Sequence, residues 1–257
     1  MNLVDMFLAG WAISAFLMLI LWEVQRRRGN AAIVDIAWAL LTGLLGIGFV
    51  CMANGNDSRR ILVLVMASGW SLRLGVYLFT RLLQDGEDSR YKRVRQQWSQ
   101  KYFFFFFQAQ ALWAVMFAAP IFASATNANA LGWLDGLGVV LWIVAIGGEF
   151  IADRQLSSFK ANVLNKGHVC QNGLWRYSRH PNYFFEWLHW WTYSCLAWGS
   201  PLWWIAAAGV VVMLLFLTKI TGIPTVEAQA VRSRGDAYRE YQRTTSGFFP
   251  WPPATLR

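Results

Sequence analysis

Runs of about 20 apolar residues with almost no charge recur along the whole sequence, and an α-helix of that length crosses the hydrocarbon core of a bilayer. The composition agrees, since 56% of the 257 residues are hydrophobic and only 14% are charged. Soluble domains carry about 25% charged residues. The chain is therefore predicted to be an all-α integral membrane protein.

Seven apolar runs predict seven transmembrane helices in a single membrane domain of residues 1–257. We place them at 6–25, 31–53, 61–80, 103–125, 131–152, 182–199 and 202–219. A polar cytosolic helix is expected at 225–243, because Pro224 follows a break at Thr221 and Gly222 and proline is tolerated in a first helical turn. The first run lacks the basic start and small-residue cleavage site of a signal peptide, so it is expected to be a retained span.

The basic residues predict the topology. Of the 23 Lys and Arg residues, only Arg59, Arg60 and Arg73 lie outside four segments, which follow the first, third, fifth and seventh spans. By the positive-inside rule these four segments are cytosolic, with the N-terminus outside and the C-terminus in the cytosol. The net charge of +9 therefore follows from topology and does not indicate nucleic-acid binding. In a bacterium the location would be the cytoplasmic membrane.

No metal site or disulfide framework is expected. The three cysteines, Cys51, Cys170 and Cys195, show none of the spacings that bind metal ions.

Four of the predicted spans carry ionisable or amide side chains, although each such charge at mid-bilayer costs about 2.5–3.5 kcal/mol. At 100° per residue each set falls on one helix face. The stripes are Asp35 with Trp38, Arg73 with Tyr77 and Trp70 at its edge, Glu149 with Asp153 and Lys160, and Asn182 with Glu186, His189 and Tyr193. The charged residues within the spans all lie in the cytosolic halves, which predicts a pocket open to the cytosol. The alternative is interhelical pairing, for example of Asp35 or Glu186 with Arg73.

Basic and aromatic side chains cluster at the expected mouth of this pocket. Arginine offers bidentate contacts to phosphates, and tyrosine rings offer stacking faces. The sequence contains no glycine-rich dinucleotide fingerprint and no P-loop, so any nucleotide would be held by side chains of the bundle and its cytosolic loops.

The segments "GLWRYSRHPNYFFEW" (173–187) and "EFIADRQLSSFK" (149–160) resemble the C-terminal domain of the steroid 5α-reductase family. "VDIAW" (34–38), "SLRLGVYLFTR" (71–81), "EDSRY" (87–91) and "GIPTVE" (222–227) extend the resemblance over nearly the whole chain, which looks like the bacterial multi-pass DUF1295-type relatives of those reductases.

The resemblance implies NADPH-dependent reduction of the C=C bond of a lipophilic 3-oxo-4-ene, steroid-like substrate that enters from the membrane. Residues 1–130 would serve mainly the substrate, and residues 131–257 would bind the cofactor. The implied catalytic residues are Asp35, Tyr77 and Glu186, with Asp35 as the acid at the carbonyl. The implied cofactor-binding residues are Arg73, Glu149, Asp153, Lys160, Tyr177, Arg179, His180, Asn182, Tyr183 and Glu227. Trp38 and Trp70 would contact the substrate.

This chain departs from the steroid enzymes at three places. Glu149 stands where they have Asn, Lys160 stands where they have Arg, and Asp35 is the nearest acid to their Gln-Glu pair. Two other functions stay open. An S-adenosylmethionine-dependent lipid or isoprenoid methyltransferase would use a similar "RHP-x-Y" segment, and a non-enzymatic lipid-binding or transport protein would use the polar stripes as a pathway. No feature of the sequence indicates the number of subunits.

Overall fold

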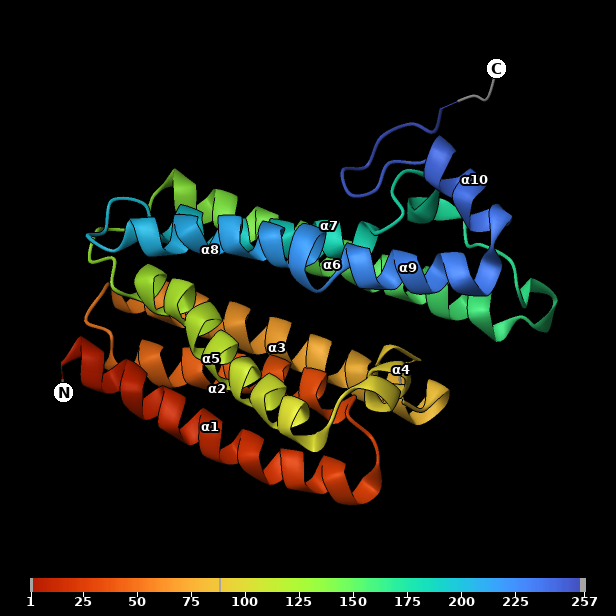
Figure 1. Cartoon of the computed structure of the whole chain (residues 1–257). Coiled ribbons are helices and arrows are strands. Elements are labelled where there is room, and N and C mark those ends of the chain that lie inside the picture. Colours follow the sequence, from red (N-terminus) through yellow and green to blue (C-terminus); the bar gives the residue numbers. More distant parts are fainter. Residues whose placement is uncertain (1, 88, 255–257) are drawn as a thin grey trace. The chain divides into compact units, whose positions relative to one another are not determined.

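The computed structural model describes residues 2–87 and 89–254, and the secondary structure of these residues is entirely helical (Figure 1). This confirms the predicted all-α class. The long helices are α1 (Leu3–Arg28), α2 (Ile33–Met52), α3 (Asp57–Asp85), α5 (Gln100–Ala125), α6 (Trp133–Ala161), α7 (Pro181–Ala197) and α8 (Trp203–Leu215). The shorter ones are α4 (Ser89–Gln97), α9 (Ile223–Arg234), α10 (Asp236–Thr244), the 3₁₀ turns η1 (Val163–Asn165) and η2 (Gly173–Arg176), and the π-helical turn η3 (Phe216–Ile220).

Six helices among the described residues are long and apolar enough to cross a membrane, which is compatible with an integral membrane protein. They are α1, α2, α3, α5, α6 and the run Trp203–Arg234 that begins with α8. The remaining predicted span, 182–199, forms α7, which has 17 residues and includes Asn182, Glu186 and His189. Because α7 is shorter than each of these six, the count of seven spans stays a prediction.

The chain forms two compact units. Unit 1 comprises Met1–Asp135 with Tyr193–Gly209, and unit 2 comprises Gly136–Thr192 with Val210–Arg257. The first division falls close to the predicted boundary after residue 130, but residues 193–209 group with unit 1. The assignment of substrate and cofactor roles to the two halves stays a prediction.

In unit 1, helix α2 packs against both α3 and α5, and α1 packs against α5. Close approach of α2 to α3 depends on Gly43, where an added Cβ would lie 2.2 Å from the Ser71 hydroxyl oxygen. The same hydroxyl donates a hydrogen bond of 2.9 Å to the carbonyl of Ala39, which ties the two helices together. Aromatic rings fill the space between these helices.

In unit 2, α6 and α7 approach closely at Gly148, where a Cβ would lie 2.4 Å from the ring of Phe185. Helix α8 continues through the π-helical turn η3, and the break predicted at Thr221 and Gly222 precedes α9. The prediction of one helix at 225–243 was wrong. Gly235, with φ 55° and ψ −126°, separates α9 from α10, because a left-handed φ ends a helix.

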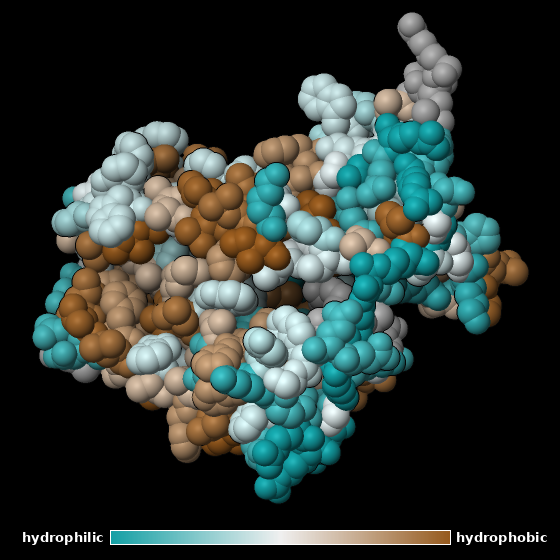
Figure 2. Space-filling model, in the orientation of Figure 1, coloured by the Kyte–Doolittle hydropathy of each residue, from teal (hydrophilic) through white to brown (hydrophobic). Residues whose placement is uncertain are grey.

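Hydropathy alone missed the polar ends of several helices. Helix α3 begins at Asp57 and runs to Asp85, four or five residues beyond the predicted 61–80 at each end. Its start is capped by Asn56, whose side chain accepts a hydrogen bond from the backbone N–H of Arg59. Helix α4, which is mostly polar, was not predicted. In unit 1 the hydrophilic surface gathers over α4 and the C-terminal end of α1 (Figure 2).

Candidate functional site

The segment that resembles the reductases folds as a turn followed by a helix. Gly173, at φ 59°, begins the 3₁₀ turn η2, and Pro181 begins α7 with its fixed φ. Between them Ser178 stabilises the turn. Its hydroxyl accepts a bond of 3.1 Å from the His180 N–H and donates one of 2.9 Å to the Phe248 carbonyl. The C-terminal tail therefore holds the start of α7 in place.

A polar seam joins α6 and α7, and we define it by Glu149, Asp153, Asn182 and Glu186. The Asn182 amide donates to the Asp153 carboxylate at 3.3 Å, and the Trp190 indole N–H donates to Glu186 at 3.0 Å. Since the two helices run antiparallel, Glu149 lies one turn from Asp153 on the side toward Glu186. Glu149 is 1% exposed, Asp153 6% and Glu186 9%. Unit 2 thus buries three carboxyl groups along one helix pair.

A charged cluster, which we call the Arg179 hub, adjoins this seam at the start of α7. Glu227 of α9 lies 2.6 Å from the Nε of Arg179 and 3.2 Å from the Nε2 of His180, and accepts a bond of 2.9 Å from Gln242. The Nη1 of Arg179 also donates to the carbonyls of Gln242 and Thr245. The hub therefore ties α9, α10 and the tail to the turn before α7.

Burial lowers the pKa of His180, although the hydrogen bond and charge of Glu227 oppose the shift. The imidazole is therefore neutral at neutral pH and stacks on Tyr183 with ring centroids 5.4 Å apart. Burial also raises the pKa of Tyr241, which donates hydrogen bonds to the carbonyls of Trp175 and Ser178. Two ionisable groups of this region thus stay uncharged.

The hub changes what Arg179 can offer a cofactor. Its Nε and Nη1 bind protein groups, and its side chain also hydrogen-bonds to Tyr238. The phosphate contact predicted for it would therefore compete with these bonds. Among the other predicted cofactor residues of unit 2, Lys160 and Tyr177 are exposed at the surface. The aromatic tail packs over the same region, since Phe248 lies against Phe184 and Trp187 with centroids 6.0 and 5.8 Å away.

The remaining predicted site residues belong to unit 1. Trp38 contacts Trp70 edge to face at a centroid distance of 6.2 Å, and Trp70 is fully buried. Arg73 and Tyr77 lie one turn apart on α3 and are half-buried. Asp35 accepts a hydrogen bond of 2.6 Å from the Tyr91 hydroxyl. The structure thus brings the predicted residues into two groups, one in each unit.

The contact of Tyr91 with Asp35 was not predicted, although Tyr91 ends the quoted motif "EDSRY". The motif and "VDIAW" are far apart in the sequence, and only the fold brings Tyr91 and Asp35 into contact. The sequence did point to both motifs, because both are part of the family resemblance. Predicting the contact between them would also require knowing that helix α4 forms and packs near the start of α2.

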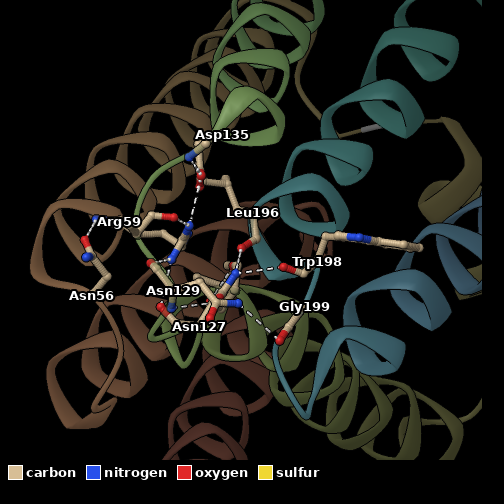
Figure 3. Close-up of polar contacts among 12 residues, drawn as sticks. Asn56, Arg59, Asn127, Asn129, Asp135, Leu196, Trp198 and Gly199 are labelled. Atoms are coloured by element: carbon tan, nitrogen blue, oxygen red, sulfur yellow. Dashed lines mark hydrogen bonds and ion pairs between the residues drawn. The ribbon is translucent and has the colours of Figure 1, made fainter.

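A second polar cluster, the Arg59 cluster, lies in unit 1 where α2 ends and α3 begins (Figure 3). The Arg59 guanidinium forms a bidentate pair with Asp135 at 2.7 and 2.9 Å. It also donates to the carbonyls of Asn127, Asn129 and Ala130. These bonds use all five N–H donors of an arginine side chain. The Asn127 amide extends the cluster to the carbonyls of Leu196 and Trp198 at 2.9 Å each. The cluster therefore joins the start of α3 to two loops, the one between α5 and α6 and the one that follows α7, and leaves its arginine no donor for a ligand.

Comparison with known proteins identifies the family. A family model described as "Protein of unknown function (DUF1295)" matches residues 21–245. The chain belongs to the DUF1295 family. A relative in this comparison is "Uncharacterized protein C594.04c" of Schizosaccharomyces pombe, 28% identical over 279 residues that cover 95% of this chain and 79% of the yeast protein. No solved structure matches this DUF1295 protein.

Proposed function

We propose that this DUF1295 protein reduces the C=C bond of a lipophilic 3-oxo-4-ene, steroid-like molecule with NADPH. It would work as a seven-span integral membrane protein, with its N-terminus outside, its C-terminus in the cytosol and its active site facing the cytosol. The observation that carries the proposal is the buried polar seam of α6 and α7, because it is built by the two segments that resemble the steroid 5α-reductases.

The seam suits the nicotinamide and ribose portion of NADPH. Carboxylates accept hydrogen bonds from ribose hydroxyls and from a carboxamide, and the Asn182 amide can both donate and accept. The phosphates require cations, and the surface of unit 2 offers Lys160 and Arg176. The residues present therefore fit the cofactor: the exposed cations would bind its phosphates, and the seam would bind its nicotinamide and ribose.

The chain's own residues would bind the substrate, orient it and polarise its carbonyl group. Bound NADPH would supply a hydride for the β-carbon of the enone, and a proton from water would add to the α-carbon to complete the reduction. Asp35, in its protonated form, would donate a hydrogen bond to the substrate carbonyl, which stabilises the negative charge that develops there in a dry site. The Tyr91 hydroxyl orients Asp35 by its bond to Oδ1, and Tyr77 would assist. Trp38 and Trp70 would form the apolar wall for the substrate rings.

The first test is to purify the protein in detergent and identify the retained nucleotide by absorbance and mass spectrometry. NADP(H) is the expected ligand. Glu186→Gln and Asn182→Ala should each lower reduction of a progesterone-like enone by at least about 100-fold while the folded yield is unchanged. Asp236→Asn, at a side chain that is 95% exposed, is the matched control and should keep full activity. Full activity of both seam variants would refute this site.

A second candidate is an S-adenosylmethionine-dependent lipid methyltransferase. The observation in its favour is that the seam holds three carboxyl groups, which suit a cofactor with a sulfonium and an amino group. Retention of S-adenosyl compounds in the same experiment would replace the first proposal with this one. Retention of lipid without any nucleotide would favour the lipid-binding or transport function.

A further inference from the structure

Helix α4 has one anchored face and one exposed face. Lys92 and Arg93 are exposed, whereas Tyr91 is 8% exposed and its ring lies 6.1 Å from that of Phe106. The helix belongs to unit 1 and lies near the N-terminal end of α2, where Tyr91 reaches Asp35 (Figure 1). Contacts with other parts of unit 1 must hold this short, mostly polar helix beside α2, because isolated helices of this length are unstable in water.

Glu87, just before α4, supplies such a contact. Its carboxylate accepts a bond of 2.8 Å from the backbone N–H of Ala31, in the turn between α1 and α2. The same carboxylate forms an ion pair with Arg95 of α4, and the Glu87 side chain is only 8% exposed. One carboxylate therefore connects the start of α2 to both ends of the α4 segment.

A glycine in the turn between α1 and α2 makes room for the Arg95 side chain that pairs with Glu87. Gly29 ends α1 in the left-handed conformation, with φ 66°. A Cβ at this position would lie 2.9 Å from the Nη1 of Arg95. A glycine is therefore required both by the backbone conformation and by the approach of the guanidinium.

We infer that Glu87 is a positioning residue, which latches α4 against the start of α2 so that the Tyr91 hydroxyl orients Asp35. This inference rests on the proposed function for the role of Asp35, but the latch itself is a property of unit 1. Without the latch, α4 separates from α2 and Asp35 loses the hydrogen bond that orients it. Glu87 thereby acts on the reaction through Tyr91 and does not touch the substrate.

Limited trypsin digestion of the detergent-purified full chain tests the latch, because Lys92 and Arg93 are cleavage sites on α4 itself. Glu87→Ala should speed cleavage at these two sites by about fivefold or more, since cleavage follows the population of the released helix. Glu87→Gln keeps an oxygen for the Ala31 N–H but loses the charge that pairs with Arg95, and should give an intermediate rate. Asp57→Asn, an exposed acid of the same unit, is the control and should cleave as the wild type does.

Two results would overturn the latch. One is an unchanged rate at Lys92 and Arg93 in Glu87→Ala. The other is an equal increase at Arg239 and Arg243 of α10, which would show general unfolding.

Kinetics test the positioning role. With NADPH and a progesterone-like enone, Glu87→Ala should lower kcat by about tenfold while KM for NADPH changes by less than about twofold. Glu87→Gln should recover part of the rate. A wild-type kcat in Glu87→Ala would refute the role, whereas absence of turnover in the wild-type protein would refute the proposed function and leave the trypsin result to test the latch alone.

Discussion

The Arg59 cluster of unit 1 and the Arg179 hub of unit 2 are both arginine–carboxylate pairs that bind loop carbonyls, but they use their arginines differently. The side chains of Arg59 and Asp135 are 2% and 7% exposed, and all five arginine donors bind protein groups. The side chains of Arg179 and Glu227 are 13% and 15% exposed, and the carboxylate is shared with His180 and Gln242. A saturated, buried pair can only stabilise the fold, whereas a pair that is partly exposed to solvent beside a polar seam can also meet a ligand.

The largest expected effect comes from breaking the saturated pair. Arg59→Ala should lower the free energy of unfolding by about 3–5 kcal/mol, because it leaves the Asp135 carboxylate buried without its cation. Unfolding in detergent, followed by tryptophan fluorescence, measures the loss. Arg239→Ala is the control, since the side chains of Arg239 and its partner Asp236 are 58% and 95% exposed and such pairs contribute about 0–1 kcal/mol.

A double variant separates the ion pair from the carbonyl contacts. Arg59→Met with Asp135→Leu removes both charges but leaves the carbonyls of Asn127, Asn129 and Ala130 without their arginine donor. It should stay clearly less stable than the wild type. Recovery of wild-type stability would show that the loss in Arg59→Ala comes from the unpaired Asp135 carboxylate and not from the loss of the carbonyl bonds.

A smaller effect on stability is expected from the Arg179 hub, whose ion pair is partly exposed to solvent. Arg179→Ala should lower the free energy of unfolding by about 1–3 kcal/mol, because the Glu227 side chain is 15% exposed and keeps His180 and Gln242 as partners. Trypsin cleavage after Arg239 and Arg243 should become faster, since the variant releases α10 and the tail. A stability loss as large as that of Arg59→Ala would contradict the distinction between the two pairs.

The smallest effect concerns pH. Because burial lowers the pKa of His180 below the value of about 6.5 for an unfolded chain, the folded state favours the neutral imidazole. Its contribution to stability is therefore present above that pH and is lost as the pH falls below it. Melting temperatures at pH 7.5 and 5.5 should differ less in His180→Gln than in the wild type. His168→Gln, at an exposed histidine, should keep the wild-type pH dependence.

Much of the architecture could be predicted because hydropathy and helical period are local properties. The apolar runs gave the all-helical class and placed six of the long helices. The break before α9 was predicted from Gly222 and Pro224. The period of the polar residues also placed Glu149, Asp153 and Glu186 on helix faces that are buried in the structure. Polar segments carry no such signal, which is why α4 and the division at Gly235 were missed.

The sequence by itself determined which segments are helical and which faces of them are polar. Only the tertiary structure decided which polar groups meet. Tyr91 reaches Asp35 across 56 positions, Arg59 reaches Asp135 across 76, and Arg179 binds Glu227 across 48. The physical reason is that a charge pattern fixes the need for a partner, because a buried polar group is costly without one. The identity of that partner depends on how distant helices pack, and hydropathy contains no information about it.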